Sequence, residues 1–138
     1  MTATTRLSWL LLVILAGASY GFIGIVFALP SNHAHAWRLA AWGASGLVYA
    51  AHTGYEQYRL GNSVLVTAVH VAMAVALGAF LLAVGATVHS ALVPSQVPQW
   101  RFLIALIIWP VITAVPAFMV AVAAAAMVTW LRRARSTR

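Results

Sequence analysis

A line of polar and aromatic side chains holds most of the chemistry that this chain offers. Its members recur at alternating steps of four and three: Arg38, Trp42, Ser45, Tyr49, His52, Glu56 and Arg59. This spacing places all seven on one face of a helix. Glu56 is the only carboxylate side chain among the 138 residues. Because an ionisable group in a membrane segment is costly, Glu56 indicates where a functional site would lie.

Two histidines are expected close to Glu56. His52 precedes it by about one helical turn, and His70 lies at a similar depth in the next apolar segment. The sequence therefore predicts a polar cluster within the membrane, formed by Tyr49, His52, Glu56, Arg59 and His70. Within this cluster we expect a hydrogen bond between His52 and Glu56 and an ion pair between Glu56 and Arg59.

Three functions fit the cluster. Imidazoles are common axial ligands of haem, so His52 and His70 suggest a b-type haem site. Alternatively, Glu56 forms a proton relay with His52, or is the titrating group of a small homodimeric transporter. In the third hypothesis, His52, His70 and Tyr49 hydrogen-bond a quinone headgroup. The structural alternative is a solvated pair of Glu56 and Arg59 at the membrane surface, which would contribute little to stability.

A second group of histidines suggests a metal site on the other side of the membrane. His33 and His35 lie in a predicted loop, and His89 lies near the end of an apolar segment. Three neutral imidazoles would suit Zn(II) or Cu(II). Exposed histidines without a metal are the alternative, since the sequence supplies no neighbouring carboxylate and no cysteine to neutralise a cation.

The composition indicates an integral membrane protein. Hydrophobic residues make up 64% of the chain and charged residues 7%, whereas a soluble domain has about a quarter charged residues. Four apolar segments predict transmembrane helices at about 7–29, 36–55, 63–93 and 102–131. Their short connections favour antiparallel neighbours, so we predict an all-α membrane protein, an up-down-up-down bundle forming one domain over residues 1–138.

Arginine positions predict the orientation in the membrane. If the N-terminus is cytoplasmic, the outer side carries only Arg38 and Arg101. The inner side then carries Arg6, Arg59, Arg132, Arg133, Arg135 and Arg138. This excess favours both termini in the cytoplasm. We therefore expect a protein of the bacterial inner membrane whose basic tail, residues 132–138, contacts anionic lipid headgroups rather than nucleic acid.

The first apolar segment carries a face of small residues. Gly17, Gly21 and Gly24 would let another helix approach closely, either within the chain or across a homodimer. The start of this segment resembles a signal peptide, but its apolar run continues to Phe27, beyond the length of a signal peptide's apolar region. We therefore expect an uncut membrane span.

The sequence does not predict an enzyme. It contains no nucleotide-binding loop and no hydrolase motif, and a single carboxylate excludes catalysis by paired carboxylates within one chain. The expected function is that of a non-enzymatic structural or accessory subunit, in a homo-oligomer or a larger membrane complex. Haem b and quinone are the cofactors that the histidines leave open.

Overall fold

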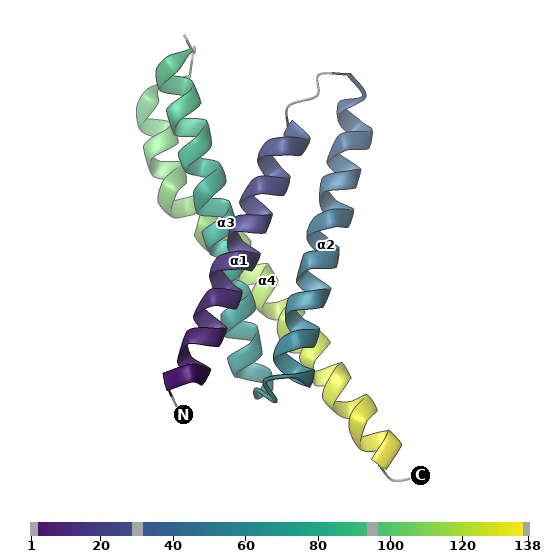
Figure 1. Cartoon of the computed structure of the whole chain (residues 1–138). Coiled ribbons are helices and arrows are strands. Elements are labelled where there is room, and N and C mark those ends of the chain that lie inside the picture. The colour runs from purple at the N-terminus through teal and green to yellow at the C-terminus, as the bar shows by residue number, and fades with distance from the viewer. Residues whose placement is uncertain (1–2, 29–31, 94–96, 137–138) are drawn as a thin grey trace.

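The computed structural model describes residues 3–28, 32–93 and 97–136. Within them the regular secondary structure is entirely helical, with four helices: α1 (Ala3–Ala28), α2 (Ala34–Tyr58), α3 (Val64–Leu92) and α4 (Gln99–Ser136). Consecutive helices run in opposite directions, and both ends of the chain lie at the same end of the molecule (Figure 1). The predicted all-α fold is confirmed. Helix α4 continues as far as Ser136, through most of the predicted basic tail.

Three of the helices are long and apolar enough to cross a membrane. These segments have mean hydropathies of 2.3 to 2.4 and comprise Ser8–Ala28, Val64–Leu92 and Gln99–Ala134. A length of about 20 apolar residues suffices to span a bilayer core. The chain is therefore an integral membrane protein. Helix α2 has 25 residues but falls outside this group, because polar side chains interrupt its apolar sequence.

Helices α1 and α3 approach closely through glycine. A Cβ atom on Gly17 would lie 2.7 Å from Cδ2 of Leu77, and one on Gly24 would lie 2.6 Å from Cδ2 of Leu82. A Cβ on Gly78 of α3 would in turn meet Tyr20. Only the absence of a side chain allows these approaches. A contact within the chain therefore accounts for the small-residue face of α1, to which Gly21 also belongs.

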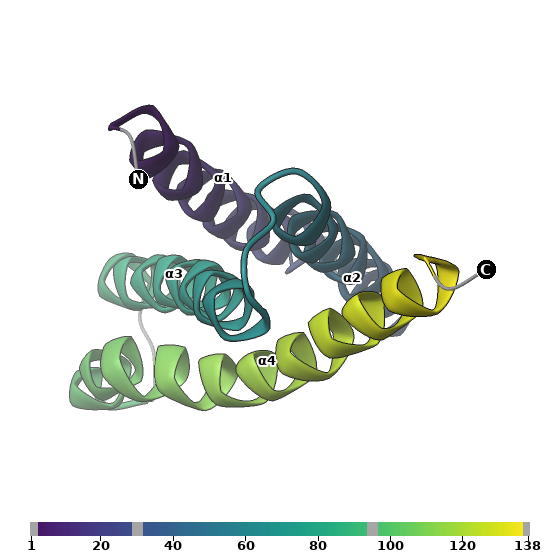
Figure 2. The ribbon, with the colours of Figure 1, turned by 90° about the horizontal axis from the view of Figure 1, so that it is seen from below.

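The helices meet at one end of the molecule and diverge at the other. The α1–α2 pair and the α3–α4 pair separate away from the chain termini (Figures 1 and 2). We call the end that holds both termini the closed end and the opposite end the open end. At the closed end α2 contributes four buried residues, all in its last two turns: His52, Thr53, Glu56 and Gln57. At the open end residues 34–40 of α2 are all exposed. The buried residues of α2 thus lie at its polar C-terminal end, while Val48 in its middle packs against the apolar cluster of Val13, Ala16 and Ala74.

Candidate functional site

A tight turn returns the chain from α2 to α3 and brings the two halves of the cluster together. Helix α2 ends at Tyr58, and Gly61 follows with a φ of 63°, in the left-handed region that glycine adopts readily. Ser63 then caps the N-terminus of α3 with its side chain. Because α3 runs back along α2, His70 reaches the level of Glu56.

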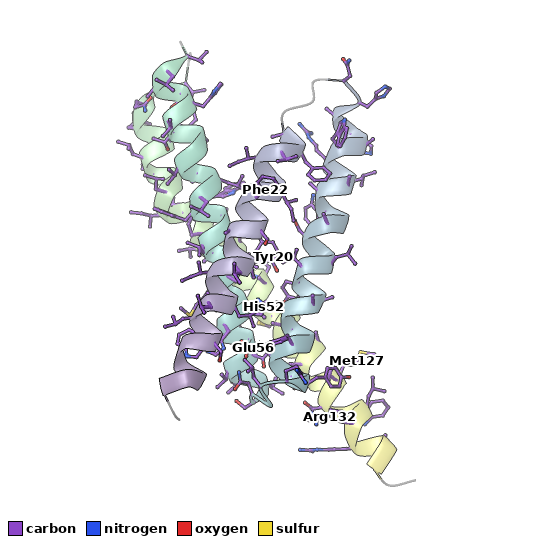
Figure 3. All side chains as sticks on the ribbon, in the orientation of Figure 1. Tyr20, Phe22, His52, Glu56, Met127 and Arg132 are labelled. Atoms are coloured by element: carbon purple, nitrogen blue, oxygen red, sulfur yellow. The ribbon has the colours of Figure 1, made fainter. Side chains whose placement is uncertain are left out.

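Glu56 is fully buried, with 0% of its surface exposed. Its Oε1 lies 3.0 Å from Nδ1 of His70 and 3.7 Å from Nε2 of His52. Its Oε2 accepts a hydrogen bond from the side-chain amide of Asn62. Figure 3 shows Glu56 and His52 in the space between the helices. The alternative of a solvated surface carboxylate is therefore wrong. The expected hydrogen bond between His52 and Glu56 is also not formed, because 3.7 Å exceeds hydrogen-bond distance.

The imidazole of His70 is fixed on its other side by Trp9 of α1. The two rings stack with centroids 4.5 Å apart and an angle of 4° between their planes. His70 is 9% exposed. The cluster thus joins three helices, because α1 supplies the indole, α2 the carboxylate and α3 the imidazole. The sequence did not indicate Trp9, because its contact with His70 depends on the register between α1 and α3.

Gln57 forms a second polar network beside Glu56. Its Nε2 donates to Oγ1 of Thr67 at 2.8 Å and to the backbone carbonyl of Asn62 at 3.2 Å. Its Oε1 accepts from Thr129 at 3.5 Å, and its backbone carbonyl accepts from Nη1 of Arg132 at 3.1 Å. These bonds tie α2 to both α3 and α4. Sequence reasoning missed Gln57, although a glutamine next to the only carboxylate of an apolar chain was the available signal.

Two predicted members of the cluster lie apart from the carboxylate. The Tyr49 hydroxyl donates to the backbone carbonyl of Ala117 at 2.6 Å, so it joins α2 to α4. Arg59 is exposed, and among the described residues Glu56 pairs only with His52 and His70, so the expected pair of Glu56 and Arg59 is wrong. The reason is that α2 ends at Tyr58. Arg59 therefore begins the turn, while Glu56 faces inward.

The histidines of the open end do not form a site. His33, His35 and His89 are exposed, and the start of α2 lies apart from the end of α3 (Figure 1). Among the described residues, no group of three histidine or carboxylate side chains is arranged to hold a metal ion. The described residues therefore give no support to the metal-site candidate of His33, His35 and His89, because the two helix pairs diverge at this end.

A pocket between α1 and α2 lies at the open end, far along α2 from Glu56. Its lining residues are mostly apolar: Gly24, Phe27, Ala28, Ala34, Arg38 and Ala41. Trp42, one turn after Arg38 on α2, is 80% exposed. The predicted polar stripe is therefore not one continuous site, and its buried chemistry is confined to the closed end.

The arrangement does not fit a bis-imidazole haem. Both histidines face the same oxygen of Glu56, so the carboxylate occupies the space between His52 and His70. Trp9 covers one face of the His70 ring. Two axial ligands need their nitrogens on opposite sides of one iron, with a porphyrin between them. Here that position is filled by the protein's own carboxylate.

Comparison with known proteins suggests no role for this cluster. No family model, curated protein or solved structure matches the chain. The fold and the site nevertheless define a class: a helical integral membrane protein with a carboxylate buried between two imidazoles, where α1, α2 and α3 meet.

Proposed function

We propose that this protein is a small, non-enzymatic accessory subunit of a membrane complex, whose cluster of His52, Glu56 and His70 binds and exchanges a proton. The observation that carries the proposal is the full burial of Glu56 between imidazoles from two helices. Intramembrane ionisable residues with partners of this kind commonly serve proton relays. Histidine is suited to the task, because its charge changes near physiological pH.

The charge balance of the cluster favours one bound proton. An ionised Glu56 beside two neutral imidazoles would leave an uncompensated negative charge in a buried place, which is strongly unfavourable. One proton makes the cluster neutral overall, either on the carboxyl group or on an imidazole. The 3.0 Å separation of Oε1 and His70 Nδ1 allows the proton to lie on either atom of one hydrogen bond. The cluster therefore has two neutral forms that differ by a short proton transfer.

His52 is placed to accept the proton next. Its side chain is buried, and neither of its ring nitrogens has a hydrogen-bond partner among the described residues. Buried polar atoms normally have partners, so an exception points to a functional role. A small rotation would bring its Nε2 from 3.7 Å into hydrogen-bond distance of Glu56 Oε1. His52 then takes the proton while His70 stays stacked on Trp9.

We further propose that α2 is a fourth membrane span and that both termini are cytoplasmic, in the inner membrane of a bacterium. Four of the polar residues that lower the hydropathy of α2, His52, Thr53, Glu56 and Gln57, are buried and need not face lipid. Two others, His35 and Arg38, are exposed near the open end of the helix. Both chain ends lie at the closed end (Figure 1). Six of the eight arginines belong to that end by sequence, in agreement with the excess of positive charge expected on the cytoplasmic side.

Infrared difference spectroscopy in lipid vesicles tests the proton site. Glu56 is the only side-chain carboxylate, so its carboxyl band competes only with that of the C-terminus. Between acidic and alkaline buffer, the wild type is expected to show a carboxyl band that Glu56→Gln removes and His52→Gln shifts. A spectrum that is identical in wild type and Glu56→Gln would overturn the proposal. The transporter hypothesis additionally requires pH-driven flux that Glu56→Gln abolishes, and the quinone hypothesis requires quinone binding that His52→Ala abolishes.

A further inference from the structure

Arginines greatly outnumber acidic side chains in this sequence. Eight arginines face a single side-chain carboxylate. That carboxylate is fully buried and is engaged by His70 and Asn62. Among the described residues, Arg132 has no carboxylate partner. At the end of a membrane helix, lipid phosphates are the nearest abundant anions.

Arg132 differs from a simple exposed arginine because the fold holds its side chain. Its Nη1 donates to the Gln57 carbonyl at 3.1 Å, and its Cζ lies 5.6 Å from the centroid of the Tyr58 ring. Gln57 lies in the last turn of α2, where backbone carbonyls lack partners within the helix. The guanidinium thus connects the ends of α2 and α4. Figure 3 shows it at the closed end, beyond Glu56.

Within the described part of the chain, the other N–H donors of Arg132 have no protein oxygen as a partner. A guanidinium carries five N–H donors, and the described contacts of Arg132 with protein oxygens use one nitrogen. The residue is exposed, as are its neighbours Trp130 (67%) and Tyr58 (62%). Tryptophan and tyrosine are enriched where a membrane protein crosses the lipid headgroups. The surface around Arg132 therefore combines a pre-positioned cation with one interfacial aromatic residue, Tyr58. Trp130 precedes Arg132 by two residues and so points to another side of α4.

We infer that the phosphate of an anionic phospholipid binds to Arg132 at the junction of α2 and α4, beside Tyr58. Arginine matches the geometry of a phosphate group with paired N–H donors. The junction lies at the end of the apolar segment Gln99–Ala134, which is the depth at which headgroups lie. One guanidinium then binds both the α2 carbonyl and the phosphate, so the lipid stabilises the contact between α2 and α4.

The same contacts connect the lipid to the buried carboxylate. Arg132 bonds to Gln57, the Gln57 amide bonds to the Asn62 carbonyl, and the Asn62 amide bonds to Glu56. A bound phosphate that fixes Arg132 would therefore also fix the amide that faces Oε2. This coupling rests on the proposed proton site, whereas lipid binding itself does not.

Thermal unfolding in nanodiscs of defined lipid tests the inference. The wild type is expected to melt several degrees higher in phosphatidylglycerol than in phosphatidylcholine. Arg132→Gln is expected to lose most of this difference. Arg101→Gln is the matched control, because Arg101 is also exposed on α4 and its Cζ lies 5.6 Å from the Trp100 ring. It has no bond to α2 among the described contacts, so its variant is expected to keep the difference.

Several outcomes would overturn the inference. One is that Arg132→Gln keeps the full difference in melting temperature between the two lipids. Another is that Arg101→Gln loses as much of this difference as Arg132→Gln. The third is that inorganic phosphate raises the melting temperature equally in phosphatidylcholine discs. If Arg132→Gln fails to fold, Arg132→Lys replaces it, with partial loss expected because lysine lacks paired donors.

Glu56→Gln separates the two proposals, since it should keep the lipid effect even if the proton site is wrong. For the coupling, phosphatidylglycerol should shift the Glu56 carboxyl band in the wild type and not in Arg132→Gln.

Discussion

The five histidines of this chain fall into two groups that differ in burial and in their contacts. At the closed end, His52 and His70 are buried within 4 Å of one carboxylate oxygen. At the open end, His33, His35 and His89 are exposed, on helix pairs that diverge. Spacing along the sequence suggested a site at both ends. Periodicity therefore places side chains on one face of a helix, while packing between helices decides whether that face becomes a site.

The largest expected difference between the two ends concerns histidine itself. His70→Ala leaves Glu56 without its closest partner and Trp9 without its stacked ring, so we expect a loss of about 3 to 5 kcal/mol in the free energy of unfolding. His89→Ala, on the same helix at the open end, should change it by less than about 0.5 kcal/mol. Unfolding in mixed detergent micelles measures both. Equal losses would mean that the closed end is no more structured than the open end.

Glycines of α3 provide a second comparison. A Cβ on Gly78 would lie 2.5 Å from Cβ of Tyr20, whereas one on Gly85 would meet nothing within 4 Å. We expect Gly78→Ala to cost up to about 3 kcal/mol through overpacking. Gly85→Ala should be neutral or slightly stabilising, because alanine favours a helix. The same micelle titration checks the pair, and a tolerated Gly78→Ala would contradict the close approach of α1 and α3.

Glutamines offer a third comparison. Gln57 is 3% exposed and bonds to α3 and α4, whereas Gln99 is exposed near the open end. Removing the Gln57 side chain leaves buried partners such as Thr67 unsatisfied, so Gln57→Ala should cost about 2 kcal/mol. Gln99→Ala should have little effect. Amide hydrogen exchange in α2 is an independent measurement. It should be faster in Gln57→Ala than in the wild type, and unchanged in Gln99→Ala.

The smallest expected effect sharpens the role of Tyr49. Tyr49→Phe removes one hydrogen bond, to the Ala117 carbonyl, and should cost about 1 kcal/mol. Tyr55→Phe is its control, because Tyr55 is on the same helix and 44% exposed. Neither variant should change the infrared band of Glu56. A changed band in Tyr49→Phe would show that Tyr49 belongs to the proton site after all.

Part of this architecture was predictable from the sequence because it depends on local features. Long apolar segments predict the helices, and Gly61 marks the turn after α2. The position of His70 opposite Glu56 follows from a short turn and helical rise alone. Contacts between distant segments were not predictable, because they depend on the register of the helices. The stack of Trp9 on His70 and the bond from Arg132 to Gln57 are of this kind.

The sequence alone does not show whether the Glu56 side chain is buried or solvated. A carboxylate three residues from an arginine near a predicted turn is compatible with a solvated surface pair. What excludes that reading is the end of α2 at Tyr58, which directs Glu56 toward α3 and leaves Arg59 in the turn. The divergence of the helix pairs was also not predictable, because neither helix propensity nor apolar periodicity sets the angle between two hairpins.

Solid-state nuclear magnetic resonance of the protein in lipid tests whether Glu56 is buried against an imidazole. Glu56 is the only glutamate, so a ¹³C-glutamate label gives a single side-chain carboxyl resonance. With ¹⁵N-labelled histidine, we predict dipolar coupling between this carboxyl carbon and an imidazole nitrogen, lost in His70→Gln and insensitive to a water-soluble paramagnetic ion. A carboxyl resonance without imidazole coupling that broadens with the ion would place Glu56 in water and contradict the account.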